Sequence, residues 1–203
     1  MLNTRQILAH FIYLGCRVTK DSKSSSEIQR RIGLGAHRFQ CLKPIWNKPE
    51  ISIRTISKIY LATVKETTIY GAESWTCSPS DYQKLINFLI RRLMQIVGPR
   101  RIGLTEQKLY SQTKTVSLDK IVRTIRLRWA GHIRRMLDTR LPKIVLFGDV
   151  LSGKRGMGRS EREWTDCLKK DCERAGIVWT KWVNESKNRE KWLIKISSLT
   201  SNT

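Results

Sequence analysis

The sequence predicts a mainly α-helical protein with a short β-strand or hairpin near its N-terminus. Along most of the chain, apolar residues recur at steps of three and four, which is the spacing of an amphipathic helix. Ser-Pro and Gly-Pro pairs bound one of these stretches, where helices start and stop. A cluster of β-forming residues stands only near the N-terminus, at 11–18. We therefore expect a hairpin unit at 1–24, a helical bundle at 25–100, a basic helical region at 101–175 and a weakly packed tail at 176–203.

The N-terminal cluster at 11–18 is expected to form a strand that leads into a turn at 21–24. A helix should begin at Ser26 and end near Pro44, with a buried stripe formed by Ile28, Ile32, Gly35, Phe39, Leu42 and Trp46.

Two more helices complete the expected bundle. Ser52 is a candidate N-cap for a helix that runs to 70–71, with an inward stripe formed by Ile53, Ile56, Tyr60, Val64 and Thr67. Pro79 should stand in the first turn of the next helix, which stops at 98–99 and turns inward Tyr82, Leu85, Phe88 or Leu89, Leu93 and Ile96.

The C-terminal half is predicted to hold shorter and more basic helices. After a short helix at 105–111, Ser117 should cap a longer one that buries a stripe formed by Leu118, Ile121, Ile125, Trp129, His132 and Met136. A break at 141–142 and a Gly-rich basic loop at 152–159 should follow. Ser160 and Glu163 form a capping box for a helix with Trp164, Cys167, Leu168 and Asp171. The tail carries Trp182, Trp192, Leu193 and Ile196 among charged residues.

Charge is the strongest indication of function. The chain has 203 residues, with 39 Lys and Arg against 17 Asp and Glu, and a formal net charge of +22. A polyanion would relieve the resulting repulsion, and nucleic acid fits best because phosphate binding releases condensed counterions. An anionic membrane is the rival partner, but no run of about 18 apolar residues exists. We expect RNA and DNA as partners and no membrane.

The basic residues concentrate between Arg91 and Arg135, where the sequence has twelve basic and two acidic residues. The candidate phosphate contacts there are Arg91, Arg92, Arg123, Arg126, Arg128, Arg134 and Arg135, with Lys154, Arg155 and Arg159 in the Gly-rich loop. A solvated helix face and a plain linker are the alternatives for these two regions. Trp129 and Trp164 are expected in the core rather than as base-stacking platforms.

No catalytic or metal-binding residue is predicted. Two-metal phosphoryl transfer needs adjacent carboxylates, and the sequence has no Asp-Asp pair. The Gly-rich loop lacks the spacing of a P-loop. Five scattered cysteines without ligand spacing indicate reduced thiols, so we expect an intracellular protein of the nucleus and cytoplasm, with no cofactor of its own.

Several segments of the chain form a recognisable set when they are taken in order: FIYLG at 11–15, EIQRRI at 27–32, YGAESW at 70–75, RRLMQIVG at 91–98, RLRWAGHIRRM at 126–136 and GKRGMGR at 153–159 leading to Trp164. This ordered set resembles the C-terminal part of the reverse transcriptase encoded by non-LTR (LINE-type) retrotransposons, the endonuclease-reverse transcriptases. The resemblance covers about residues 10–175.

The resemblance implies a role for each region. The hairpin at 1–24 would be a remnant of the palm and primer grip, with Tyr13, Leu14 and Gly15 near the primer end, and 25–100 would be the thumb. The catalytic Asp-Asp motif, which holds Mg²⁺ in the parent polymerase, would lie before residue 1, and the rest of the palm, the fingers and the endonuclease would also be missing. The expected function is therefore that of a truncated RNA-directed DNA polymerase fragment, which binds template-primer but is inactive alone.

Two other hypotheses remain open on the sequence. One is a self-standing helical DNA- or RNA-binding protein, a domesticated remnant of the element, whose helix at 117–136 enters a major groove. The other is an RNA-associated structural protein.

Overall fold

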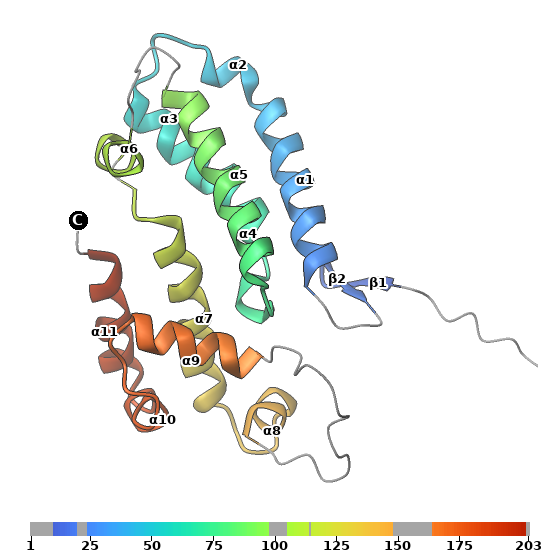
Figure 1. Ribbon diagram of the computed structural model, residues 1–203, viewed down its shortest axis with the longest axis vertical. Coiled ribbons are helices and arrows are strands. Elements are labelled where there is room, and N and C mark those ends of the chain that lie inside the picture. The colour runs from blue at the N-terminus through green and yellow to red at the C-terminus, as the bar shows by residue number, and fades with distance from the viewer. Residues whose placement is uncertain (1–9, 20–23, 98–104, 114, 148–163, 202–203) are drawn as a thin grey trace, which may run out of the picture. The chain divides into compact units, whose positions relative to one another are not determined.

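The computed structural model describes residues 10–19, 24–97, 105–113, 115–147 and 164–201, and within these the protein is mainly helical with one two-stranded hairpin (Figure 1). The predicted fold class is confirmed. The chain forms two compact units: the first comprises Met1–Gly71 and Cys77–Lys114, and the second Ala72–Thr76 and Thr115–Thr203. The predicted boundary at 100–101 therefore differs from this division. None of the helices in the described ranges is both long and apolar enough to cross a bilayer.

The N-terminal hairpin consists of β1 (His10–Tyr13) and β2 (Cys16–Thr19), which pair antiparallel with Tyr13 opposite Cys16. The sequence predicted one strand through 11–18, but the turn at Leu14 and Gly15 divides it. Both turn residues have positive φ, 46° and 78°, as the tight hairpin loops that match strand twist require. Glycine adopts a positive φ without strain, so Gly15 suits the turn. Leucine rarely adopts a positive φ, so the identity of residue 14 does not indicate a turn in the sequence.

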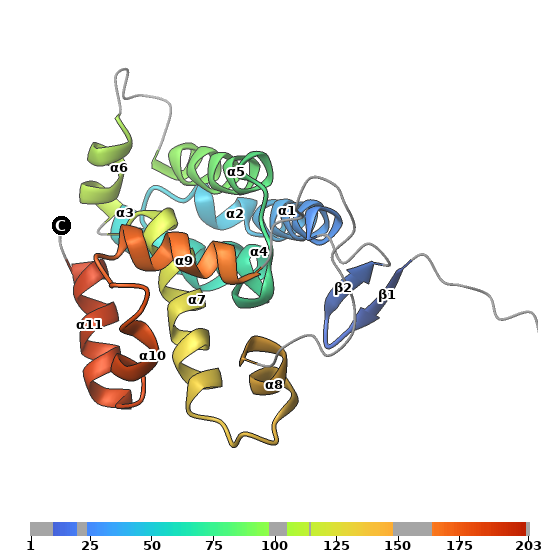
Figure 2. The ribbon, with the colours of Figure 1, turned by 60° about the horizontal axis from the view of Figure 1, so that its bottom comes forward.

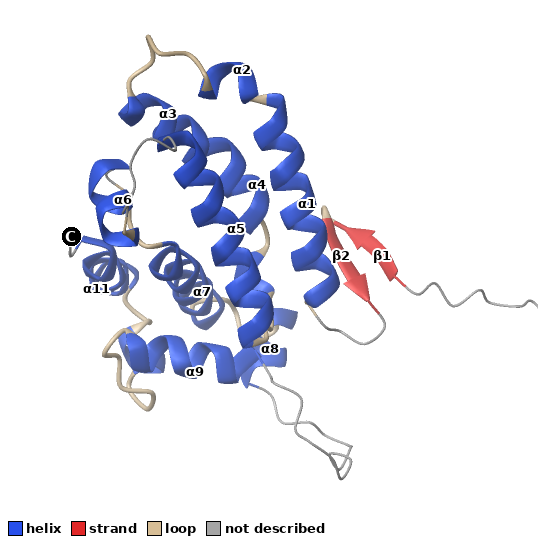
Figure 3. Ribbon diagram, turned by 45° about the horizontal axis from the view of Figure 1, so that its top comes forward, coloured by secondary structure: helices blue, strands red, loops and turns tan. Residues whose placement is uncertain are grey.

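Six α-helices are present among the described residues of the first unit. They are α1 (Ser25–Cys41), α2 (Lys43–Trp46), α3 (Ile53–Tyr60), α4 (Glu66–Ile69), α5 (Pro79–Val97) and α6 (Glu106–Thr113). Figure 3 shows α1 beside α5 and the hairpin beside the first turns of α1. The buried side chains include Ile28, Phe39, Ile56, Tyr60, Val64, Leu85, Leu89, Leu93 and Ile96, which confirms much of the predicted stripes.

The helix predicted from Ser52 to 70 is interrupted by a π-helical turn, η1 (Leu61–Lys65), between α3 and α4. Ser52 caps α3 as predicted, since its hydroxyl accepts a hydrogen bond from the backbone N–H of Thr55 at 3.2 Å. The wider π turn rotates the residues that follow, so Thr68 is buried while Thr67 is only half-buried.

The described residues of the second unit form a 3₁₀ turn and five α-helices. They are η2 (Ala72–Ser74), α7 (Leu118–Arg134), α8 (Leu141–Phe147), α9 (Trp164–Arg174), α10 (Trp182–Glu185) and α11 (Arg189–Ser201). Figure 2 shows α11 beside α7. The core of this unit is formed by Leu127, Ala130, Leu168, Cys172, Ile177, Trp182, Trp192 and Ile196.

The prediction of a weakly packed tail at 176–203 is wrong for its described residues. Trp192 is 1% exposed, and its indole N–H donates a hydrogen bond to the carbonyl of Leu127 at 3.0 Å. Gly131 permits this contact, because a Cβ there would lie 2.3 Å from Nε1 of Trp192. The C-terminal helices are therefore part of the core, although the apolar residues of α11, which include the adjacent Trp192, Leu193 and Ile194, do not mark a single face in the sequence.

The buried face of α7 also differs from the predicted one. Val122, Leu127, Ala130 and Ile133 are buried, whereas most of the predicted stripe is half-buried and His132 is exposed. Helix α7 carries apolar residues on two faces, and its contacts with α9 and α11 bury the face that contains Leu127.

Both ends of α7 differ from the prediction. The Ser117 side chain makes no capping hydrogen bond, and α7 ends at Arg134, before the 141–142 pair that starts α8.

Candidate nucleic-acid interface

The arginines of α7 fall into two groups, and the first group is used inside the second unit. Arg126 is 4% exposed and pairs with Asp171 of α9. Arg123 pairs with Asp119 one turn earlier, and its side chain is 12% exposed. Both were predicted phosphate contacts, but their charges are already matched by carboxylates. The Arg126 pair joins α7 to α9, whereas the Arg123 pair lies within α7.

Arg134 and Arg135 lie at the C-terminal end of α7, where cations interact favourably with the helix dipole. The guanidinium of Arg134 lies 5.8 Å from the centroid of the Phe147 ring in α8. Arg135 donates a hydrogen bond to the carbonyl of Ser186 at 2.7 Å, which fixes its guanidinium between α7 and α11.

The second group of arginines lines a groove, which we call the α7 groove. Its walls are formed by α7 and α11, and its volume is about 490 Å³, with the lining residues Arg128, His132, Arg135, Arg189 and Leu193. An adjoining hollow of about 350 Å³ shares Arg128 and His132 and is completed by Glu73, Ile125 and Trp129. Because Arg128 and His132 line both hollows, we include the adjoining hollow in the α7 groove.

Two arginines of the α7 groove have no ion-pair partner in the part of the second unit that the structure describes. Arg128 and Arg189 are exposed, and neither forms an ion pair with any residue in the described ranges. Burial and the nearby charge of Arg189 lower the pKa of Arg135. Two guanidinium groups that repel each other in this way would be stabilised by an anion placed between them.

An aromatic pair lies beside these cations. The ring centroids of Trp129 and His132 are 5.3 Å apart at an interplanar angle of 38°. Trp129 is half-buried and His132 is exposed, so part of the pair faces solvent. The prediction of a core position for Trp129 is therefore only partly met. Trp164, in contrast, packs on the core and donates its indole N–H to the carbonyl of Glu73 at 2.7 Å.

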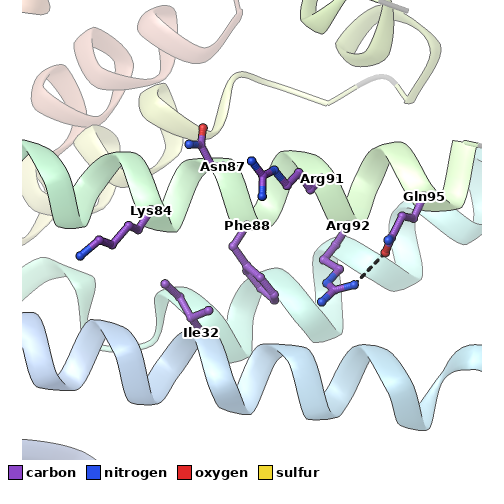
Figure 4. A pocket seen from close by; sticks show the side chains of 7 residues that line it. All are labelled: Ile32, Lys84, Asn87, Phe88, Arg91, Arg92 and Gln95. Atoms are coloured by element: carbon purple, nitrogen blue, oxygen red, sulfur yellow. Dashed lines mark hydrogen bonds between the residues drawn. The ribbon is translucent and has the colours of Figure 1, made fainter. Parts of the chain in front are cut away.

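The first unit has a separate cationic groove along α5, which we call the α5 groove. Its volume is about 570 Å³, and it is lined by Ile32, Lys84, Asn87, Phe88, Arg91, Arg92 and Gln95. In Figure 4, Phe88 and Arg92 point from α5 toward α1, while Arg91 extends away from α1. The Arg92 guanidinium lies 5.2 Å from the Phe39 ring centroid and donates to Gln95 Oε1 at 2.9 Å. Arg92 is thus held in place, whereas Arg91 is exposed.

At the hairpin, the turn is fixed and the side chains are exposed. Arg30 and Arg31 both donate to the carbonyl of Gly15, and the Tyr70 hydroxyl donates to the carbonyl of Leu14 at 3.1 Å. Tyr13 and Leu14 are 63% and 76% exposed. The side chains of two predicted primer-grip residues, Tyr13 and Leu14, are therefore exposed at a turn whose backbone is held by hydrogen bonds.

The anchor depends on Glu27, whose side chain is 3% exposed. Its carboxylate accepts hydrogen bonds from Arg30 at 2.8 Å, from Arg31 at 2.6 Å and from the backbone N–H of Arg17 at 2.9 Å. Burial raises the pKa of Glu27, but the hydrogen bonds from these arginines outweigh it and the pKa is lowered overall. We call Glu27, Arg30 and Arg31 with the Gly15 carbonyl the Glu27 cluster.

The structure brings together only part of the predicted binding set. Arg128 and Arg135 share the α7 groove, while Arg91 and Arg92 belong to the α5 groove of the other unit. Lys154, Arg155 and Arg159 lie outside the described residues, as do the rest of the 152–159 loop and the Ser160–Glu163 capping box. Sequence reasoning missed Arg189, because it stands in the segment taken for a tail. Its available signal was the pair Trp192 and Ile196, which have helical spacing.

The described residues contain no cluster of three or more His, Cys, Asp or Glu side chains able to hold a metal ion. The chemistry that the two grooves offer is anion binding, with an aromatic surface in the α7 groove.

The sequence is similar to that of a Caenorhabditis elegans protein that is named as uncharacterized and transposon-derived. The two are 26% identical over 209 residues, covering 95% of this chain and 72% of the relative. No family model matches the chain. No solved structure matches it either.

Proposed function

We propose that this chain is a nucleic-acid-binding part of a non-LTR retrotransposon reverse transcriptase, corresponding to the thumb and the region that follows it. It holds template-primer through its cationic grooves, and the carboxylates that carry out polymerisation belong to the palm. The parent polymerase uses Mg²⁺ at those carboxylates, and this segment binds the template-primer without catalysing polymerisation.

The α7 groove carries the proposal. A helix face that is merely solvated usually interleaves acidic and basic side chains, but this groove gathers Arg128, Arg135 and Arg189 from two helices that are distant in sequence. Asp119 and Asp171 pair with Arg123 and Arg126, whereas the groove arginines form no ion pair with the described residues. A phosphate backbone is a partner that such a surface fits.

Two further observations support a retrotransposon origin. The order of elements, an anchored hairpin with exposed side chains followed by a helical bundle, agrees with a primer grip followed by a thumb. The similarity to a transposon-derived protein extends over nearly the whole chain. Together with the ordered sequence segments, these favour an element-encoded polymerase over an unrelated basic protein.

The direct test is a salt titration of binding to an RNA–DNA or DNA primer-template. If about six to ten phosphates are contacted, affinity should fall by on the order of a thousandfold or more between 50 and 200 mM salt, with little dependence on sequence. Fluorescence anisotropy or filter binding measures this. An affinity that does not change with salt would contradict the proposal.

A primer-extension assay tests the second half of the proposal. With Mg²⁺, nucleotides and an annealed primer-template, the chain alone should bind the substrate without extending it. Robust extension would show that it contains a polymerase site of its own and would overturn the assignment to the thumb region.

A further inference from the structure

The α7 groove joins two features that a duplex-binding surface does not need to combine. At one end, Arg128, Arg135 and Arg189 line a hollow. At the other end, the Trp129 and His132 rings are tilted against each other and partly face solvent. Arg128 and His132 belong to both ends, so a ligand of a few nucleotides would contact both.

Phosphate alone does not explain the aromatic end. In a duplex the bases are stacked on one another, and an aromatic side chain at the backbone meets only sugar and phosphate. An unpaired base exposes its π-face, and stacking on Trp or His is how proteins bind single strands without reading sequence. The apolar side chain of Ile125 beside Trp129 suits a base and not a phosphate.

The two ends of the α7 groove also differ in charge. Glu73 of η2 lines the aromatic end, where its carboxylate repels phosphate. Arg135 and Arg189 line the opposite end, where none of the described lining residues carries a carboxylate. The backbone of a bound strand is therefore favoured at the α11 end and a base at the η2 end.

On this basis we propose that the α7 groove is a site for single-stranded nucleic acid, in which Arg128, Arg135 and Arg189 bind consecutive phosphates and an unpaired base stacks on Trp129 and His132. The inference rests on the proposed nucleic-acid-binding function and narrows it to the unpaired template or the displaced strand. RNA and DNA share the chemistry that the groove recognises, so the experiment separates them.

The test uses the whole chain and fluorescein-labelled strands of about 15 nucleotides, within the range of single-strand site sizes. The probes are a mixed-sequence RNA, the same sequence as DNA, and the blunt DNA duplex. Wild-type protein is compared with Trp129→Ala and Trp129→Phe by anisotropy. Trp129→Ala should weaken single-strand binding about fivefold or more and change duplex binding less than about twofold, while Trp129→Phe keeps most of the affinity. The stronger single-strand probe identifies RNA or DNA as the preferred ligand.

His132→Ala is the second variant, because this exposed side chain can be removed even if Trp129→Ala fails to fold, and it should show the same selective loss. Lys169→Gln in α9 is the matched control, since this exposed cation does not line the groove. Equal losses on single strands and duplex, or no loss from the aromatic variants, would overturn this inference and leave the proposed function intact. Failure of the wild-type protein to bind any probe would instead refute the proposed function.

Discussion

The Glu27 cluster of the first unit and the α7 groove of the second unit both gather arginines, yet they use them in opposite ways. In the cluster, one buried carboxylate pairs with two guanidinium groups, and both guanidinium groups donate to the carbonyl of Gly15 in the hairpin turn. In the groove, Arg128 and Arg189 are exposed and form no ion pair with any described residue. The placement of a few acidic residues therefore determines which arginines hold the fold and which remain available to a ligand.

The same contrast occurs within α7. Arg126 and Arg128 are two residues apart, so they point to different sides of the helix, and only Arg126 meets a carboxylate, that of Asp171. Burying a charge is costly unless it is paired, which explains why Arg126 is inside and Arg128 is not. The net charge of +22 thus overstates the charge available for binding.

The largest expected effect on stability is that of Glu27→Gln. This change leaves the guanidinium of Arg31, a residue that is 6% exposed, without its counter-charge. Removing one partner of a buried ion pair typically costs about 3–5 kcal/mol of the free energy of unfolding. Urea denaturation measures the loss, with Glu50→Gln as the control because Glu50 is exposed. Equal stability of the two variants would mean that the cluster does not hold the hairpin.

The pH dependence of stability sharpens this test. The pKa of Glu27 is lowered in the folded protein, so its contribution is present above its ordinary unfolded pKa and is lost as pH falls through the lowered folded pKa. Wild-type stability should therefore decline in that acidic window. Glu27→Gln should show a smaller decline there, and an unchanged decline would contradict the role of this carboxylate.

A double-mutant cycle on Arg126 and Asp171 should give the next largest effect. Arg126→Leu and Asp171→Leu each leave one buried charge unpaired and should each cost about 3 kcal/mol, whereas the double variant should recover much of that loss. Chemical denaturation of the four proteins gives the coupling energy. Additive losses would show that the two side chains do not depend on each other.

A glycine pair tests the packing of α7 against α11. Gly131→Ala should cost about 1–3 kcal/mol, because the new Cβ would lie 2.3 Å from Trp192 and the overpacked core must shift. Gly33→Ala in α1 is the matched control, since a Cβ there meets nothing within 4 Å. It should raise stability by about 0.5–1 kcal/mol through helix propensity alone. Thermal melts that shift in the same direction for both variants would contradict this account of α7.

Local signals in the sequence predicted most of the first unit. The Ser52 cap, Pro79 and the four-residue spacing of Ile56, Tyr60 and Val64 are properties of adjacent turns, and they fixed the helices. The π turn at 61–65 and the positive φ of Leu14 depend on tertiary packing and on the anchor at Gly15. No residue pattern in either segment indicates them.

The candidate site was predicted less well, because its geometry depends on contacts between distant residues. Asp171, which removes Arg126 from the surface, lies 45 residues further along the chain. Arg189, which completes the α7 groove, comes from a helix whose apolar residues do not mark a single face in the sequence. Charge density indicated α7 as a candidate binding region but could not distinguish its paired arginines from its exposed ones.

The central claim is that the unpaired groove arginines, and not the basic residues in general, neutralise phosphate. The most direct test is the slope of log affinity against log salt for a single strand, compared between wild-type protein and the double variant Arg128→Gln and Arg189→Gln. Two lost phosphate contacts should reduce the steepness of that slope by about 1.4. The control is Lys169→Gln with Lys170→Gln, which removes the same charge from exposed positions on α9. An unchanged slope for the groove variant, or an equal reduction in the control, would contradict the claim.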